Sequence, residues 1–435
     1  MGCRQLGIIV VLIGLTGCER APAKVEPVQS SEKLGPQPVV PITTSETDWP
    51  VWRGSDQKGT AADQPIPVKW SETENLIWQA EVPGRGHSSP IRCGPAVYLA
   101  TADEGQQTQS VVAYDFATGK QLWETVLHRG HFTGIHPKNS HASATVCCDG
   151  TNVYAAFING DKLWATALDP SGKQLWQTEV GPFNSEHGYG ASPTLYGSVL
   201  ILSGDSIGTG YLAAVNRGTG DVVWRTPRQV ESTNGSYASP IVTELAGRTQ
   251  VLLAGFNHVT GYDPETGKQL WQVSGPSRVL GNTLAASDPY VIASGGYPEQ
   301  NILGIKIDNP DQVSDANIVW KKSKNVAYVP SPVVVDDRVL ILADDGPLAC
   351  YEIASGDLKW QRRLPGSFTA SLTRVGKLFL VPNEQGEMIV FEVDPEFKIL
   401  SKNKLSDAGG MATPAVCEGR ILIRSDHRLF CIGEK

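Results

Sequence analysis

The sequence predicts an all-β fold, an eight-bladed β-propeller built from four-stranded blades. Tryptophans recur at intervals of 40 to 53 residues, short apolar runs bounded by turn residues recur between them, and one motif of about ten residues is repeated five times. A repeat of this period that contains only strand and turn patterns is typical of propeller blades. The seven recurring tryptophans are Trp78, Trp123, Trp176, Trp224, Trp271, Trp320 and Trp360, and an eighth position falls near Ser401.

Each unit opens with a short strand, in most units around a Ser-Pro or Thr-Pro step such as Ser89-Pro90. An apolar run such as VLIL at 199–202 follows, and runs of this kind suit strands that are buried on both faces. A third strand leads into the recurring motif, which reads YDPETGKQLW at 262–271. There Asp263 can accept backbone N–H bonds and Gly267 can adopt a positive φ. The motif therefore predicts a hairpin turn, followed by an outer strand whose tryptophan plugs the wedge between neighbouring blades.

The last unit, 412–432, stops after three strands. A fourth strand is available near the other end of the chain in NLIWQAEV, 75–82, which carries Trp78 in the plug position. We therefore expect this N-terminal strand to join the last blade and close the ring, which leaves no exposed sheet edge. A one-dimensional solenoid is the alternative, and the spare strands at the two ends argue against it.

Charge and composition exclude one class of partner. The chain has 435 residues with 45 Gly, 29 Pro and a net charge of -8, and it contains no long basic run. A protein that binds nucleic acid needs a cationic face, so nucleic acid is not an expected partner.

The first eighteen residues predict a targeting signal rather than part of the fold. Arg4 precedes an apolar run at 6–15 that is too short to span a bilayer. The run ends in LTGC, which resembles the lipobox of bacterial lipoproteins. The resemblance implies export and lipidation at Cys18, and Glu19 after the cysteine implies an outer-membrane anchor facing the periplasm. An ordinary signal peptide is the alternative.

Two further segments precede the repeats. Residues 19–47 are rich in Pro, Ser, Thr, Glu and Lys and predict a disordered tether. Residues 48–74 form an entry segment that packs on the propeller of residues 75–435.

The repeated motif resembles that of the PQQ-repeat propellers, which include outer-membrane assembly lipoproteins of the BamB type and quinoprotein alcohol dehydrogenases. The resemblance covers 75–435 and weakens at 306–320 and 392–402. It implies a noncatalytic, monomeric scaffold that binds an envelope protein through the loops entering the inner strands. The alternatives are a dehydrogenase that uses PQQ and Ca²⁺ on alcohols or sugars, and a propeller that binds a small ligand or a glycan.

The segment DWPVWRG at 48–54 resembles the entry segment of such propellers, and we expect Trp49 and Trp52 on the outside of the barrel. In the dehydrogenases PQQ lies over a tryptophan in the central funnel. No tryptophan of this chain starts an inner strand, so we expect no such platform, no catalytic residue and no cofactor. The pair Cys147–Cys148 resembles the adjacent cysteines of some quinoprotein dehydrogenases, but it falls in a predicted turn. Cys350 and Cys431 lie in apolar strand patterns and are expected to be buried free thiols.

A candidate pocket follows from the repeat register. The residue just before each opening strand should line one entrance of the channel, and polar or aromatic groups gather in blades 1 to 5. With their neighbours in the preceding loops, these residues are Arg85, His87, His141, His187, Tyr189, Tyr237 and Asn282. The acidic pairs Asp336–Asp337 and Asp344–Asp345 fall in predicted hairpin turns, which explain them.

The longest loop between blades, 127–141, contains four of the eight histidines: His128, His131, His136 and His141. Imidazole is a common metal ligand, but this spacing fits no standard pattern and no carboxylate lies in the loop. We therefore expect a recognition loop rather than a metal site.

Overall fold

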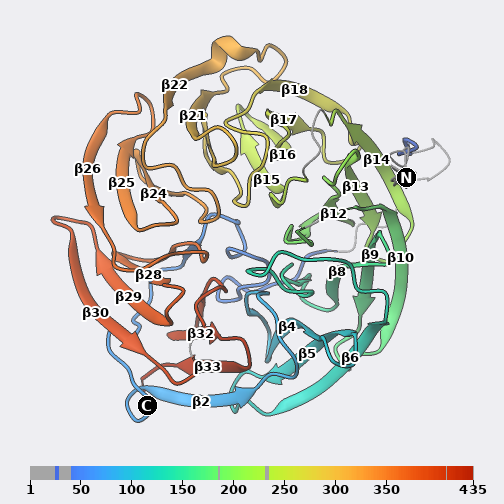
Figure 1. Ribbon diagram of the computed structural model, residues 1–435, viewed down its shortest axis with the longest axis vertical. Helices are drawn as coiled ribbons and strands as arrows, with labels where there is room; N and C mark the ends of the chain where they lie inside the picture. The colour runs from blue at the N-terminus through green and yellow to red at the C-terminus, as the bar shows by residue number, and fades with distance from the viewer. Residues whose placement is uncertain (1–24, 29–40, 185–186, 231–234, 408, 435) are drawn as a thin grey trace, which may run out of the picture.

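The computed structural model describes residues 25–28, 41–184, 187–230, 235–407 and 409–434. Within them, eight sheets form blades arranged in a ring around a central axis (Figure 1), and the four main strands of each blade are antiparallel. The predicted eight-bladed, all-β propeller is confirmed. Among these residues the one helix is the 3-10 turn η1 (Asp315–Asn317). No helix in the described part of the chain has the length and apolar character needed to cross a membrane.

Each blade runs from an inner strand at the channel to an outer strand at the rim. Blades 1 and 2 comprise β3 (Ile91–Cys93), β4 (Ala96–Asp103), β5 (Thr108–Asp115), β6 (Gln121–Arg129), β7 (Cys147–Cys148), β8 (Val153–Asn159), β9 (Lys162–Leu168) and β10 (Gln174–Pro182). Blades 3 and 4 comprise β11 (Thr194–Tyr196), β12 (Val199–Ser203), β13 (Gly210–Asn216), β14 (Val222–Arg228), β15 (Ile241–Leu245), β16 (Arg248–Gly255), β17 (His258–Tyr262) and β18 (Gln269–Ser274).

Blades 5 and 6 comprise β19 (Ala285–Ser287), β20 (Tyr290–Gly295), β21 (Asn301–Lys306), β22 (Ile318–Lys322), β23 (Val333–Val335), β24 (Arg338–Leu342), β25 (Pro347–Glu352) and β26 (Leu358–Arg363). Blades 7 and 8 comprise β27 (Thr373–Val375), β28 (Leu378–Pro382), β29 (Glu387–Glu392), β30 (Lys398–Lys404), β31 (Ala415–Cys417), β32 (Arg420–Arg424), β33 (Arg428–Ile432) and β2 (Leu76–Glu81). The second and third strands of the blades are almost wholly buried, as their apolar sequences predict.

The ring closes as the sequence predicts. Strand β2 pairs antiparallel with β33, with Trp78 opposite Cys431, and forms the outer strand of blade 8. A strand from the start of the fold therefore completes a sheet made by the end of the chain, and the propeller has no open junction.

The recurring tryptophans lie between blades. In five of them the indole N–H donates to a main-chain carbonyl in the next blade, and the acceptor always directly follows the Asp, Asn or Glu of the motif. The five bonds are Trp78 to Phe116, Trp123 to Pro170, Trp176 to Arg217, Trp224 to Pro264 and Trp320 to Ile353. The motif glycine gives room to the indole, because a Cβ on Gly172 would lie 2.5 Å from Trp123.

Two tryptophans depart from this pattern because the blade ahead of each has a weakened motif. Trp271 faces the unit at 306–320 and donates instead to Gln250 Oε1 of its own blade, at 2.6 Å. Trp360 faces the unit at 392–402 and packs on Phe397, with ring centroids 6.1 Å apart. Both tryptophans therefore still fill the wedge between blades, but neither makes the hydrogen bond to the next blade that the other five make.

A ring of hydroxyl groups links the inner strands, and the sequence analysis did not predict it. At seven of the eight junctions, the main-chain N–H of one ring residue donates to the hydroxyl oxygen of the ring residue in the next blade, at 2.8–3.1 Å. At the junction between blades 4 and 5, Thr283 Oγ1 donates to the carbonyl of Ser239 instead. The ring residues are Ser89, Thr145, Ser192, Ser239, Thr283, Ser331, Ser371 and Thr413.

The entry segment lies inside the channel, so the expectation that Trp49 and Trp52 lie on the outside of the barrel is wrong. Trp49 forms a two-way backbone pair with Arg92 next to the inner strand of blade 1, and it is 3 % exposed. Strand β1 (Thr60–Ala61) pairs in parallel with β27, the inner strand of blade 7. The blue N-terminal segment accordingly crosses the middle of the ring in Figure 1.

Side chains of the entry segment fix this path. Arg53 is buried and donates to the carbonyls of Ser331 and Pro332 in blade 6, at 3.5 and 2.7 Å. Gln57 exchanges hydrogen bonds with Pro240 and Val242 in blade 4. Main-chain N–H and C=O groups of the inner strands therefore find partners in the segment that fills one end of the channel.

Parts of the predicted tether also contact the propeller. Val28 forms an antiparallel bridge with Arg225 on the outer strand of blade 3, and Thr43 N donates to the carbonyl of Asp149 at 2.8 Å. The structure differs from a free tether at 25–28 and 41–47. The predicted targeting signal with Cys18 and the remainder of the tether lie outside the described residues.

Candidate functional site

A cavity of about 580 Å³ occupies the channel at the end opposite the entry segment. We call this cavity the cup and its open end the mouth. Its wall carries hydroxyls of the ring, its rim carries side chains of the loops between blades, and Trp52 reaches it from the entry segment. The size lies within the range typical of small-ligand sites, about 300–1,000 Å³.

The position of Trp52 shows that the expectation of no tryptophan facing the channel is wrong. The sequence analysis found no tryptophan facing the funnel, because none starts an inner strand. The structure supplies one from outside the repeats, since Trp52 is half-buried and lines the cup. No repeat pattern could indicate this position.

Three of the seven predicted pocket residues line the cup, namely His87, His187 and Tyr237. The rings of His187 and Tyr237 stack with centroids 6.3 Å apart, and His136 meets His187 edge-on at 5.5 Å. Blades 2 to 4 thus give the mouth a wall of imidazole and phenol rings.

The other four predicted pocket residues lie beside or behind the cup. His141 packs on Phe132 at 4.1 Å, and Tyr189 is buried with its hydroxyl donating to Ser203. Asn282 is buried and donates to the carbonyls of Ala327 and Tyr328. Arg85 supports His87 from outside the cavity.

The hydroxyl ring explains the errors at His141 and Asn282. In every blade the residue two positions before the ring residue lines the cup, and these residues are His87, Ser143, Gly190, Tyr237, Gly281, Val329, Thr369 and Met411. The sequence predicts His141 and Asn282 at the positions where the structure places Ser143 and Gly281. Blades 2 and 5 have Thr145-Val146 and Thr283-Leu284 where most other blades have a Ser-Pro or Thr-Pro step, and the predicted residue is displaced there by two positions and by one.

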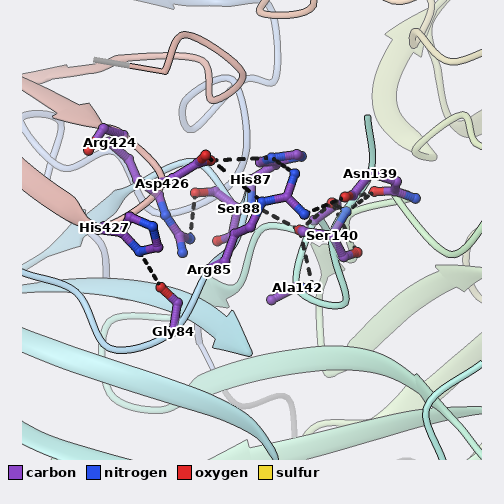
Figure 2. A network of polar contacts seen from close by, with 12 residues as sticks. Gly84, Arg85, His87, Ser88, Asn139, Ser140, Ala142, Arg424, Asp426 and His427 are labelled. Carbon is purple, nitrogen blue, oxygen red and sulfur yellow. Dashed lines mark hydrogen bonds and ion pairs between the residues drawn. The ribbon is translucent and has the colours of Figure 1, made fainter. Parts of the chain in front are cut away.

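A polar network holds His87 at the rim (Figure 2). Its Nε2 lies 3.6 Å from Asp426 and 3.4 Å from the guanidinium of Arg85, which also donates to the carbonyl of Asn139 at 3.1 Å. Burial lowers the pKa of His87, and the hydrogen bond from His87 lowers the pKa of Asp426. These contacts link Asp426 of blade 8, the segment before blade 1 and the loop before blade 2.

The opposite side of the mouth is acidic. Asp344 accepts the N–H groups of Tyr328 and Val329 at 2.7 and 3.1 Å, and burial raises its pKa. Asp345 and Glu384 also line the cup. Asp344 and Asp345 lie in a hairpin turn, as predicted, but the bonds of the Asp344 carboxylate go to the loop before blade 6 and not to the turn itself. Turn chemistry therefore does not explain why both carboxylates lie at the cavity.

The loop that follows blade 1 lies partly over the mouth. Lys138 from this loop places its ammonium 2.9 and 3.0 Å from the carboxylate of Glu384 in blade 7. Of the four histidines predicted in the loop, only His136 lines the cup; His128 packs between Phe157 and Trp164 instead. Among the described residues, no group of three His, Cys, Asp or Glu side chains is arranged to hold a metal ion.

The cysteines lie away from the cup. Cys147 and Cys148 form strand β7 itself rather than a turn, which corrects the sequence analysis, and both are buried as free thiols. Burial raises the pKa of Cys147 well above its usual range. Cys350 and Cys431 are buried free thiols as expected.

The cup residues do not fit PQQ. This cofactor carries three carboxylates, and the described charged groups that line the cup include the carboxylates Asp344, Asp345 and Glu384. The one ammonium group among them, Lys138, is paired with Glu384. Trp52 provides an aromatic face, but no arginine is among the described residues that line the cup, and the described residues include no group of three His, Cys, Asp or Glu side chains arranged for a Ca²⁺ ion that would offset the carboxylate charge.

The closed ring, the inter-blade tryptophans and the cup define a β-propeller of the PQQ-repeat class. The family model described as outer membrane protein assembly factor BamB matches residues 59–188 and 162–396, and the chain belongs to this family. The chain is 28% identical over 297 residues to the BamB of Burkholderia pseudomallei (strain K96243), covering 66% of this chain and 68% of that protein. It is 25% identical over 374 residues to the BamB of Yersinia pestis, covering 82% and 78%.

Solved structures share the fold. BamB from Moraxella catarrhalis superposes with a TM-score of 0.58 at 15% identity, covering 82% of this chain and 98% of that one. The quinohemoprotein alcohol dehydrogenase from Comamonas testosteroni gives 0.60 at 13% identity, covering 89% and 81%. Because a BamB and an alcohol dehydrogenase match with similar TM-scores, the fold alone does not show which function this chain has.

Proposed function

We propose that this protein is a noncatalytic scaffold of the cell envelope that binds a partner protein and takes part in outer-membrane protein assembly. Membership of the BamB family supports this role, as do relatives from two organisms that are named outer membrane protein assembly factors. The proposal includes export and anchoring at the outer membrane through Cys18, as the lipobox resemblance implies.

The observation that carries the proposal is an exposed loop held in place across the mouth. His136 and Lys138 are exposed, yet the Lys138–Glu384 ion pair joins residues 246 positions apart and Arg85 holds the carbonyl of Asn139. A loop that is already ordered loses little conformational entropy when it binds a partner. This loop therefore gives the mouth face a preformed surface for protein recognition.

A membrane pull-down with a charge-reversed loop tests the proposal. Lys138→Glu removes the ion pair with Glu384 and places a second negative charge beside it. We therefore expect at least a threefold loss of the co-purified partner. Lys359→Glu is the matched control, because Lys359 forms a similar, partly exposed ion pair with Glu352 on blade 6, where β25 ends and β26 begins, at the end of the blade away from the mouth. Equal recovery with both variants and with the unmodified protein would contradict partner binding through this loop.

The anchor has its own test. We expect Cys18→Ser to abolish incorporation of labelled fatty acid and to move the protein from the membrane fraction to the soluble fraction. Labelling that persists in this variant would contradict lipidation at Cys18.

A further inference from the structure

The ring hydroxyls leave hydrogen-bonding capacity that the fold does not use. Six of them line the cup: Ser89, Thr145, Ser192, Ser239, Ser371 and Thr413. Each accepts one main-chain N–H from the ring, and none donates its own proton to another described residue. Their side chains are at most 5 % exposed. A hydroxyl that has accepted one bond still has a proton and a lone pair to offer, so the wall can both donate and accept.

Aromatic rings line the same cavity. Trp52 reaches the cup from the entry segment, and the stacked rings of His187 and Tyr237 form part of the wall. An apolar ring face beside many hydroxyl groups suits a ligand that has both C–H faces and polar edges.

The charges of the cup favour a neutral ligand over an anion. Asp344 and Asp345 line the wall, and the ammonium of Lys138 is engaged by Glu384. These carboxylates would repel a phosphate or carboxylate group, whereas they readily accept hydrogen bonds from alcohols.

We propose that the cup binds a neutral carbohydrate, with one sugar ring stacked on Trp52 and its hydroxyls hydrogen-bonded to the ring hydroxyls and to Asp344 and Asp345. Because the entry segment fills the other end of the channel, the sugar enters through the mouth, and a longer glycan would insert its terminal residue. The site goes beyond the proposed function, and the loop at Lys138 lines the mouth of the same cup, so a sugar and a partner protein would share this entrance.

Isothermal titration of the folded protein with neutral sugars tests the site. The probes are glucose, galactose, mannose, N-acetylglucosamine, cellobiose and lactose, each raised to about 20 mM to reach weak affinities. We expect saturable binding of at least one sugar and an affinity loss of about tenfold or more in Trp52→Ala. Asp345→Asn changes an exposed carboxylate at the rim, and we expect it to fold normally and to weaken binding about threefold.

Tyr297→Ala is the matched control, because Tyr297 is exposed outside the cup and should not affect sugar affinity. If Trp52→Ala does not fold, Trp52→Leu replaces it, and Asp345→Asn gives an independent result. No saturable heat with any of the six sugars would overturn the proposal. Sugar binding that is equally strong in the Trp52 and Asp345 variants would also overturn it, because the site would then lie elsewhere.

Discussion

The main-chain N–H of Thr413 donates to the hydroxyl oxygen of Ser89 at 3.0 Å, although 324 residues separate them. This bond joins blade 8 to blade 1 at the channel, while β2 joins the same two ends of the chain at the rim. The propeller is therefore closed twice, by a shared sheet outside and by the hydroxyl ring inside.

Ser89→Ala tests the inner closure. The substitution leaves the buried N–H of Thr413 without an acceptor, so we expect unfolding free energy to fall by about 1–3 kcal/mol. Ser355→Ala, in the exposed turn of blade 6, should change it by less than about 0.5 kcal/mol. Urea denaturation of both variants measures the difference, and equal stability would argue against a structural role for the ring.

Gly172→Ala tests the contact between a motif glycine and the preceding tryptophan. Gly172 has φ +83° and its added Cβ would meet Trp123 at 2.5 Å, so we expect a loss of about 2–4 kcal/mol from backbone strain and overpacking. Gly94→Ala is the control, because its φ is +57° and nothing lies within 4 Å of the added Cβ. There only the strain of about 1 kcal/mol should appear. If both variants lose the same free energy of unfolding, the contact between the added Cβ and Trp123 contributes nothing to the destabilisation.

Arg53→Met tests how the entry segment is held. Burial lowers the pKa of Arg53 to about 10, and its guanidinium donates to carbonyls of Gln57, Lys58, Ser331 and Pro332. Removing these donors should destabilise the protein by about 2 kcal/mol or more and speed proteolysis within 48–62. Arg363→Met, on an exposed outer strand, should leave the proteolysis rate unchanged. An unchanged rate in Arg53→Met would contradict this anchoring.

His128 predicts a pH dependence of stability. Burial lowers its pKa from 6.5 to about 4, so the unfolded chain takes up a proton at a higher pH than the folded protein. The stability from the neutral imidazole is present above pH 6.5 and is lost as the pH falls towards 4. His128→Gln should flatten this part of the stability curve relative to the unmodified protein. Urea denaturation at several pH values between 4 and 6.5 measures how the free energy of unfolding changes with pH in the variant and in the unmodified protein. The same pH dependence in both would contradict a role for His128.

PQQ provides a direct test of the dehydrogenase alternative. Because no described arginine lines the cup and no group of three described His, Cys, Asp or Glu side chains is arranged to hold a metal ion, we expect no saturable uptake of PQQ with Ca²⁺ and no dye reduction with an alcohol panel. Quinone absorbance and dye assays on the folded protein measure both. Saturable uptake with turnover would make the cup an active site.

The fold was predictable because its determinants repeat. Seven of the eight blades place a tryptophan at an inter-blade contact, mostly against a motif turn, at intervals of 40 to 53 residues, so the blade number and the closure by β2 could be predicted from the sequence alone. The hydroxyl ring was not predicted, because a serine before a proline also fits an ordinary strand start. Its bonds join residues of different blades, and no local pattern indicates them.

The cup was only partly predictable for the same reason. His87 and Tyr237 occupy repeat positions, whereas Trp52 belongs to a segment that has no repeat to align. Lys138 and Glu384 meet from blades far apart in the chain, and their pairing depends on the closed ring. The repeats thus specify the frame and the hydroxyls of the cup wall, whereas Trp52, Lys138 and Glu384 come from positions that the repeat does not fix.

Site-specific photocross-linking in the native envelope tests the central claim, that the mouth face binds a partner protein. Tyr297 and Leu358 are suitable positions because they are similarly exposed, at 55% and 51%, on a mouth loop and on an outer strand. With a photoreactive residue at each position in turn, the account predicts a discrete cross-linked envelope protein from position 297 and none from position 358. A cross-link from position 358 alone, or from neither position, would contradict the claim.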